Sequence, residues 1–272
     1  MCGEEQYISS TQNTKIKRLL ALQEKSSERR KSGLFVVEGR RELQHCIEAG
    51  YEIESVFVEM KNEESRFTLH SSLRNIFTVS PHVYERIAYR GSTEGVVAIV
   101  RAKPHTLEDL LPSLTGGVGG GSLFIVLESV EKPGNLGAVL RSADAAGATA
   151  VIVCDPLTDL YNPNLIRASI GACFTVPTVA CSSEECIRFL KAHGVQILTA
   201  QLQDSHLYYD TDMTGPTAIV MGTESTGLTE QWRQAADAHI RIPMLGRLDS
   251  LNVSVSAAIL LFEAVRQREI KG

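Results

Sequence analysis

Short apolar segments alternate with helix-patterned segments along most of this 272-residue chain, and beyond residue 122 the alternation is nearly unbroken. Repeated strand–helix units of this kind predict a mainly parallel sheet with helices packed on both faces. The predicted fold class is therefore α/β. The strands expected in this part span 123–130, 150–154, 175–179, 196–200, 218–221 and 239–242, and the helices span 136–146, 164–170, 184–192, 229–236 and 253–265.

The first hundred residues repeat the pattern on a smaller scale. Helices are expected over 15–25, 40–49 and 81–89, and strands over 34–37, 55–58, 75–79 and 96–100. The segment 104–122 follows, and its glycine tract at 116–121 has no side chains to pack, which is typical of a flexible tether. The sequence thus predicts a small α/β domain over 1–103, a linker over 104–122 and a larger domain over 123–272.

Charge is unevenly distributed along the chain. The net charge is −5, but residues 1–45 hold nine Lys and Arg against six Asp and Glu. Clustered basic side chains suit contacts with phosphate groups. The alternative is a solvated helix face, which charge alone favours because Glu24, Glu28 and Glu42 are interspersed. The candidate RNA-binding residues are Lys15, Lys17, Arg18, Arg29, Arg30, Arg40 and Arg41.

Several functional classes are disfavoured by composition. No run approaches the roughly 20 apolar residues of a membrane helix, and the acidic N-terminus lacks the apolar core of a secretory signal. A soluble, cytoplasmic protein is expected. The six cysteines form no Cys-x-x-Cys pair and the seven histidines show no ligand spacing. Buried, reduced thiols and no metal site are therefore the expectation.

Three polar turns carry the side chains most suited to chemistry. The first runs from Lys132 to Arg141, the second from Val220 to Leu228, and the third from Ile242 to Asn252. Structural roles are open for each: Ser and Asn cap helices, an arginine can pair three residues along a helix, and a first-turn glutamate is favoured by the helix dipole. The polar residues in question are Asn135, Arg141, Glu224, Ser250 and Asn252.

In order and spacing, these turns resemble the three signature motifs of the SpoU/TrmH family of RNA 2′-O-ribose methyltransferases, within the SPOUT superfamily. The resemblance covers roughly residues 119–270. It implies S-adenosylmethionine as cofactor, RNA as substrate, a homodimer, and a deep trefoil knot formed by the loops around Gly222 and Leu251. Strand alternation alone predicts an unknotted doubly wound sheet, because threaded chains are very rare.

The resemblance also implies roles for particular residues. The five polar residues Asn135, Arg141, Glu224, Ser250 and Asn252 match the family's catalytic positions. The family arginine is proposed to help deprotonate the ribose hydroxyl. A guanidinium stays protonated in nearly every protein site, so clamping a phosphate and stabilising the alkoxide is the alternative role. The family's common form has glycine where this chain has Ser225. The expected cofactor contacts are Gly222, Ile242 and Leu251, with Thr199, Ala200 and Gln201 as further candidates.

The segment from Gly33 to Leu43 is similar to the start of the L30e/L7Ae-like substrate-binding domain that many such enzymes carry. This implies that the N-terminal domain recruits RNA, with ribosomal RNA favoured over transfer RNA. One alternative is a non-catalytic RNA-binding or ribosome-assembly protein on the same fold. Another is an ordinary doubly wound nucleotide-binding enzyme with Asp155 as the ribose ligand. The turn Pro133-Gly-Asn-Leu-Gly137 does not fit the glycine fingerprint which that enzyme class requires.

Overall fold

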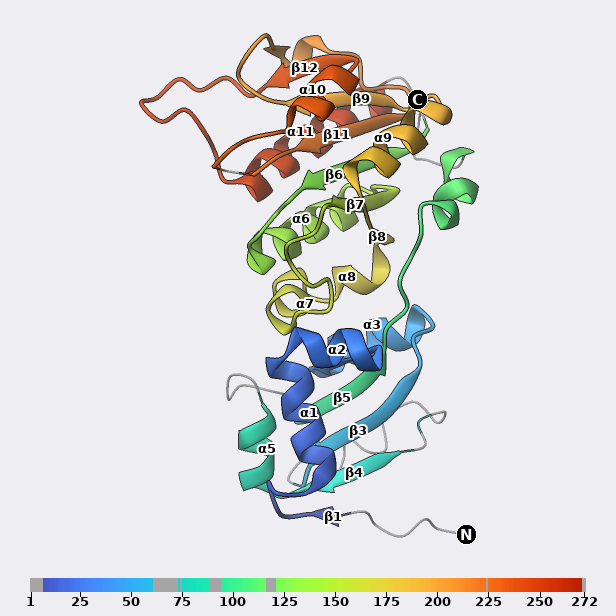
Figure 1. The fold of residues 1–272 in the computed structure, drawn as a ribbon, viewed down its shortest axis with the longest axis vertical. Coiled ribbons are helices and arrows are strands. Elements are labelled where there is room, and N and C mark those ends of the chain that lie inside the picture. The colour runs from blue at the N-terminus through green and yellow to red at the C-terminus, as the bar shows by residue number, and fades with distance from the viewer. Residues whose placement is uncertain are drawn as a thin grey trace. The chain divides into compact units, whose positions relative to one another are not determined.

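The computed structural model describes residues 7–60, 73, 75–88, 94–115, 121–223 and 225–270. The chain forms two compact units (Figure 1). Unit 1 combines the chain up to Lys103 with Leu160–Phe174, and unit 2 contains Pro104–Asp159 and Thr175–Gly272. The segment 160–174 thus packs with the N-terminal unit, although it lies within the range predicted for the larger domain.

Unit 1 is built on a five-stranded mixed sheet in the order β1-β4-β3-β5-β2. The pairs β1–β4 and β3–β4 are parallel, whereas β5 runs antiparallel to both β2 and β3. The strands are β1 (Tyr7–Ile8), β2 (Leu34–Glu38), β3 (Ile53–Glu59), β4 (Ile76–Val79) and β5 (Val96–Arg101). The helices are α1 (Thr14–Glu24), α2 (Ser26–Ser32), α3 (Arg40–Glu48), α5 (Pro81–Ile87), α7 (Pro163–Ser169) and α8 (Ala172–Thr175).

The segment 160–174 packs on unit 1 through aromatic rings. The ring of Phe35, on β2, stacks on that of Tyr161 with centroids 4.4 Å apart, and on that of Phe174 at 5.9 Å. Phe35 is fully buried. Aromatic pairs at these separations add to the stabilisation that burial already provides. A second cluster on the other side of the sheet includes Ile16 and Leu19 of α1, and Phe57 of β3.

Unit 2 is built on a seven-stranded sheet in the order β10-β12-β9-β11-β6-β7-β8, and every recorded pair is parallel. This confirms the α/β class with mainly parallel strands. The strands are β6 (Leu123–Glu128), β7 (Ala150–Cys154), β8 (Thr178–Cys181), β9 (Gln196–Ala200), β10 (His206–Leu207), β11 (Thr217–Met221) and β12 (Ala238–Arg241). The helical segments are η2 (Glu108–Thr115), α6 (Pro133–Ala145), α9 (Ser183–Ala192), η3 (Tyr208–Asp210), α10 (Glu230–Ala235) and α11 (Val253–Ile270).

Helices cover both faces of this sheet. Phe124 and Val126 of β6 share one core cluster with Phe189 of α9 and Trp232 of α10. Ile125 and Leu127 alternate with them along β6 and are also fully buried, so they point to the opposite face. That face is covered by α6 and α11, which pack against each other and against the central strands.

Several boundaries differ from those expected. Residue 175, predicted to open a strand, instead ends α8, and the strand begins at Thr178 after Pro177. Helix α6 begins three residues earlier than predicted because Pro133 occupies its first turn, where proline is favoured. Gly134 and Gly137 therefore lie inside the helix rather than in the preceding turn. Helix α2 and the short β1 and β10 were not predicted.

The predicted tether is partly structured. Leu107 and Leu110, around the start of η2, are buried in the core of unit 2, which explains why this segment packs instead of extending. The glycines at 116–120 lie outside the described residues. Among the described helices, none has the length and apolar character needed to cross a membrane.

Candidate functional site

A cavity of about 420 Å³ opens where three neighbouring strands of unit 2 end. Ala200 ends β9, Met221 ends β11 and Arg241 ends β12, and all three line the cavity. The carboxyl ends of parallel strands are the usual ligand-binding edge of an α/β sheet. The volume lies within the roughly 300–1,000 Å³ typical of small-molecule sites.

The loop after β11 folds back on itself against this cavity. Gly227 donates its backbone N–H to the Thr223 carbonyl at 3.0 Å, and the Thr223 and Thr226 hydroxyls lie 2.7 Å apart. A side chain at Gly222 would bring its Cβ within 2.3 Å of the Gly227 carbonyl carbon. Glycine at 222 is therefore a steric requirement of the loop.

Ser225 fits this loop without strain. Among the described non-glycine residues, those with positive φ are Ser129, Asp155, Ile170 and Asp204, so position 225 does not demand the glycine found in the common family form. The Ser225 hydroxyl instead lies 3.3 Å from that of Thr223, and the residue lines the cavity.

Two buried polar atoms on the cavity wall have no hydrogen-bond partner among the described residues: Gln201 Oε1 and Arg233 Nε. An unpaired buried polar atom is costly, so such atoms point to a ligand that completes them. One is an acceptor and the other a donor. The cavity therefore fits a small polar molecule that carries both donors and acceptors. S-adenosylmethionine, with its adenine amine, ribose hydroxyls and carboxylate, is a molecule of that kind.

The third turn brings two of the predicted catalytic residues together. Asn252 directly precedes α11 and caps it: its Oδ1 accepts from the Ser254 N–H at 2.9 Å, and its carbonyl accepts from the Ser256 N–H. The structural role as a helix cap is thus real. At the same time the Asn252 Nδ2 donates to Asn135 Oδ1 at 3.2 Å. This bond joins the starts of α6 and α11 beside the cavity.

The remaining predicted catalytic residues are Arg141, Ser250 and Glu224. Arg141 is exposed on α6 and makes no hydrogen bond or ion pair with any described residue, while Asp144, its suggested partner, accepts from Thr175 at 2.7 Å. Ser250 is exposed and lines the cavity. Glu224 lies outside the described residues, so its placement stays a prediction.

The predicted cofactor residues separate into two groups. The structure places Ala200, Gln201, Gly222, Ile242 and Leu251 on the cavity wall. Thr199 does not line it. This residue is fully buried within β9, and its hydroxyl lies 2.5 Å from His239 Nδ1 on the adjacent β12. Thr199 therefore links two strands instead of facing a ligand.

Among the predicted RNA-binding residues, the prediction for Arg29 is wrong. It is only 5 % exposed, and its guanidinium donates to the Leu22 and Gln23 carbonyls at 2.6 and 3.0 Å. These bonds satisfy carbonyls at the end of α1, so Arg29 holds two helices together and is not available to a phosphate. The other six are exposed on unit 1: Lys15, Lys17, Arg18, Arg30, Arg40 and Arg41.

Some of these exposed cations already have acidic neighbours. Arg18 forms an ion pair with Glu54 at 2.6 Å, and Arg41 pairs with Glu42 at 3.0 Å. A surface pair such as Arg18–Glu54 contributes little to stability, whereas Glu42 is buried. Both arginine side chains are still more than half exposed, which is compatible with phosphate binding.

Asp155 does not behave as a nucleotide-binding carboxylate. Its Oδ2 accepts from the Ser183 hydroxyl at 2.6 Å and from the Ser183 N–H at 3.2 Å. It follows β7, whereas the cavity lies at the ends of β9, β11 and β12. The doubly wound nucleotide-binding alternative thus loses its ribose ligand.

Reasoning from sequence missed three cavity residues with suitable chemistry: Arg233, Met244 and Asp249. Met244 and Asp249 belong to the third turn and could have been noted there. Arg233 lies on α10, in a helix with no motif of its own, and nothing in its sequence context marks it. Only the tertiary structure brings its guanidinium to the cavity.

Comparisons with known proteins match two regions of this chain, one that contains the cavity and one that contains the exposed cations. Residues 122–262 match the model of the SpoU rRNA Methylase family. The chain belongs to this family. Residues 13–98 match the MRM3-like substrate binding domain. All the cavity residues lie inside the SpoU match, and the six exposed cations lie inside the substrate-binding match.

Three relatives of this SpoU family chain are named as ribosomal RNA methyltransferases. The 23S rRNA (guanosine-2′-O-)-methyltransferase RlmB of Yersinia pestis is 41% identical over 66% of this chain and 74% of its own length. The 23S rRNA (uridine(2479)-2′-O)-methyltransferase of Streptomyces viridochromogenes is 29% identical over 95% of this chain and 92% of its own. The AdoMet-bound rRNA methyltransferase from Sinorhizobium meliloti superposes with a TM-score of 0.85 at 30% identity, covering 96% of this chain and 97% of that one.

Proposed function

We propose that this SpoU family chain transfers a methyl group from S-adenosylmethionine to the ribose 2′-hydroxyl of a nucleotide in 23S ribosomal RNA. The observation that carries the proposal is the cavity at the ends of β9, β11 and β12, with the bonded pair Asn135–Asn252 beside it. The AdoMet-bound structure of a relative with the same fold supports the choice of cofactor.

The cavity residues hold the cofactor in this proposal. Gln201 Oε1 accepts a hydrogen bond from it, Arg233 Nε donates one, and Gly222 lets the loop backbone approach closely. When bound, S-adenosylmethionine supplies an electrophilic methyl group. The protein then contributes alignment of the acceptor oxygen and help in removing one proton.

The polar residues around the cavity carry out the second task. Asn135 and Asn252 orient the acceptor nucleotide, since their mutual hydrogen bond fixes both amides. Ser250 lines the cavity and contacts the reacting groups. Arg141, exposed and without a protein partner among the described residues, clamps a phosphate and stabilises the developing alkoxide, or assists deprotonation. Glu224, which matches the family's carboxylate, is the residue to which we assign a role near the reaction centre.

Unit 1 recruits the RNA. Its match to a substrate-binding domain and its six exposed cations support this role. The relatives act on 23S rRNA, which favours ribosomal over transfer RNA, and their guanosine and uridine targets leave the base open. The family resemblance further implies a homodimer formed through unit 2 and a trefoil knot that involves the loops at Gly222 and Leu251. It also implies a cytoplasmic location, where ribosomal RNA is assembled.

The test is transfer of labelled methyl groups from S-adenosylmethionine to unmodified transcripts of 23S rRNA, 16S rRNA and transfer RNA. We expect label in 23S rRNA, with one linkage becoming resistant to alkali because its 2′-oxygen is methylated. Arg141→Ala is expected to lower transfer by about 100-fold while leaving cofactor affinity intact, as Arg141 does not line the cavity.

Three other outcomes would change the conclusion. Label in transfer RNA only would move the substrate to that class. Cofactor binding without transfer to any RNA would favour the non-catalytic RNA-binding alternative. No cofactor binding at all would remove the methyltransferase proposal.

A further inference from the structure

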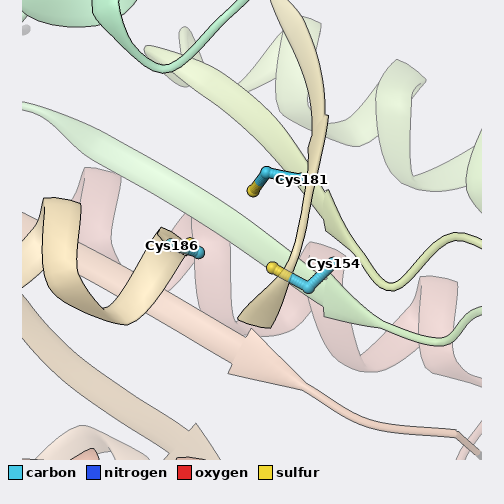
Figure 2. A group of neighbouring side chains, drawn as sticks. All are labelled: Cys154, Cys181 and Cys186. Carbon is cyan, nitrogen blue, oxygen red and sulfur yellow. The ribbon is translucent and has the colours of Figure 1, made fainter. Parts of the chain in front are cut away.

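Three cysteine side chains gather at the β8 side of the unit 2 sheet (Figure 2). Their Sγ atoms all lie within 4.8 Å of one another. Cys154 ends β7 and Cys181 ends β8, and the two are paired in register on these adjacent parallel strands. Cys186 lies in the first turns of α9. Sequence spacing did not reveal this group, because the three come from separate elements.

The group is well shaped for a metal ion. Cys154 and Cys186 are fully buried, while Cys181 is only partly covered. Zinc–thiolate bonds of about 2.3 Å place coordinated sulfurs about 3.8 Å apart. Small rotations of the three side chains would bring them from their present separation to that distance. The partly exposed side at Cys181 leaves an entry path and a position for a fourth ligand.

The charges around the group favour a bound cation over a reactive thiol. The carboxylates of Asp155 and Glu185 both lie near Cys181. Reactive and redox-active cysteines need electropositive surroundings, and here the neighbouring charges are negative. A cation is attracted by those same carboxylates. The N-terminus of the ten-residue α9 adds a favourable dipole for the Cys186 thiolate.

The three thiols hydrogen-bond to one another. These contacts hold the sulfurs together in the native fold, where one cation can take the place of the protons between them.

We propose that Cys154, Cys181 and Cys186 bind one thiophilic d10 metal ion, Zn²⁺ or Cu⁺. Soft thiolate ligands select these ions over harder cations. On binding, the three S–H protons leave to solvent: three thiols and Zn²⁺ become a trithiolate complex of charge −1 and three protons. For Cu⁺ the same exchange gives a complex of charge −2. No oxidation or reduction is involved.

The site would tie the start of α9 to the ends of β7 and β8. Ser183, the first residue of α9, accepts a hydrogen bond from Trp232 Nε1 at 2.9 Å and lies 3.4 Å from Glu128 Oε1. Glu128 in turn accepts from Thr229, just beyond the loop of the candidate active site. A bound ion would therefore stabilise a network that reaches that loop.

The test uses the full chain, reduced and stripped of metal by a chelator. Zn²⁺ is added in one arm and acetonitrile-stabilised Cu⁺ in the other, and retained metal is counted by elemental analysis after dialysis. We expect one equivalent of at least one ion, and thiolate-to-metal charge-transfer absorption when Co²⁺ is substituted. The melting temperature should rise with the retained ion.

Cys181→Ser and Cys186→Ser should weaken retention by at least about 10-fold, since losing even an outer partner of a metal ligand costs that much. Cys181 is partly covered, so its variant should fold even if the Cys186 variant does not. Cys173→Ser, at another partly buried cysteine outside the group, is the control and should retain the ion. Three results would overturn the proposal: no metal retained by the unaltered chain, equal retention by all variants, or loss of two titratable thiols to a disulfide under mild peroxide with no metal retained.

Discussion

At the scale of single residues, some residues of the candidate site have both a structural role and a role at the cavity. Asn252 caps α11 through its side-chain oxygen and holds Asn135 through its nitrogen. Gly222 is required by the backbone of its own loop and also lies on the cavity wall. Substitutions that separate these tasks distinguish a structural role from a functional one.

Gly222→Ala should impair cofactor binding. The added methyl would sit 2.3 Å from the Gly227 backbone, so the loop must shift. Overpacking of this kind costs typically 1–3 kcal/mol, and we expect S-adenosylmethionine affinity to fall about 10-fold or more in calorimetric titration. Gly134→Ala is the control, because a Cβ there meets nothing within 4 Å and alanine suits a helix. Unchanged affinity in Gly222→Ala would show that the loop does not contact the cofactor.

Asn252→Asp should separate capping from catalysis. Aspartate caps a helix as well as asparagine does, so the melting temperature should be retained. The hydrogen bond to Asn135 Oδ1 loses its donor, and methyl transfer is expected to fall about 100-fold. Full activity with full stability would restrict Asn252 to its structural role. Asn252→Ala should in addition lose about 1 kcal/mol of stability, measured by denaturant unfolding.

At the scale of secondary-structure elements, helix ends are set by local chemistry. Helix α9 begins with a capping box, in which the Ser182 side chain accepts from the Glu185 N–H and the Glu185 carboxylate accepts from the Ser182 N–H at 2.9 Å. Helix α6 begins at Pro133, and α11 begins directly after its cap, Asn252. The starts of α9 and α6 fix the positions of Cys186 and Asn135, and the start of α11 lies on the cavity wall.

The α9 capping box should make stability depend on pH. Hydrogen bonds from the Ser182 N–H and hydroxyl lower the pKa of Glu185 below its ordinary value of 4.5. A lowered pKa in the folded state stabilises the fold above that ordinary value, and this contribution disappears as the pH falls below it. Glu185→Gln should therefore lower the melting temperature at neutral pH and less so in acid. Glu184→Gln, exposed on the same turn, is the control and should show no such pH dependence.

At the scale of the whole molecule, the chain closes unit 2 by tying its last helix back to distant loops. Arg268, near the end of α11, is 3 % exposed and donates to the carbonyls of Met213, Gly121, Ser122 and Gly215. Burial lowers the pKa of this arginine, although a guanidinium remains charged. The four carbonyls balance that buried charge.

Arg268→Ala should lower the free energy of unfolding by about 3 kcal/mol, because several buried carbonyls lose a charged donor. Arg268→Lys should recover part of that loss, since an ammonium cannot reach four carbonyls at once. Arg188→Ala removes an exposed arginine and should change stability by less than about 0.5 kcal/mol. Guanidinium unfolding measures all three. A loss for Arg268→Ala no larger than the control's would mean that the carbonyls find water instead.

Much of the fold and part of the candidate site could be predicted. The order of strands and helices in unit 2 follows from apolar periodicity, and the three turns identified the family and the strand ends that form the cavity. Thr199 and Arg29 looked like functional residues, but both are buried and bonded to neighbouring structure. Burial depends on which elements pack together, and no local pattern reports it.

The sequence by itself determined the α/β class, the mainly parallel sheet of unit 2 and the turns that carry polar residues, because strand and helix periodicity and turn chemistry are local properties. Only the tertiary structure decided three other features: the packing of residues 160–174 with unit 1, the place of Arg233 on the cavity wall, and the meeting of Cys154, Cys181 and Cys186. Each joins residues far apart in the chain, and their proximity is fixed by strand order and helix packing.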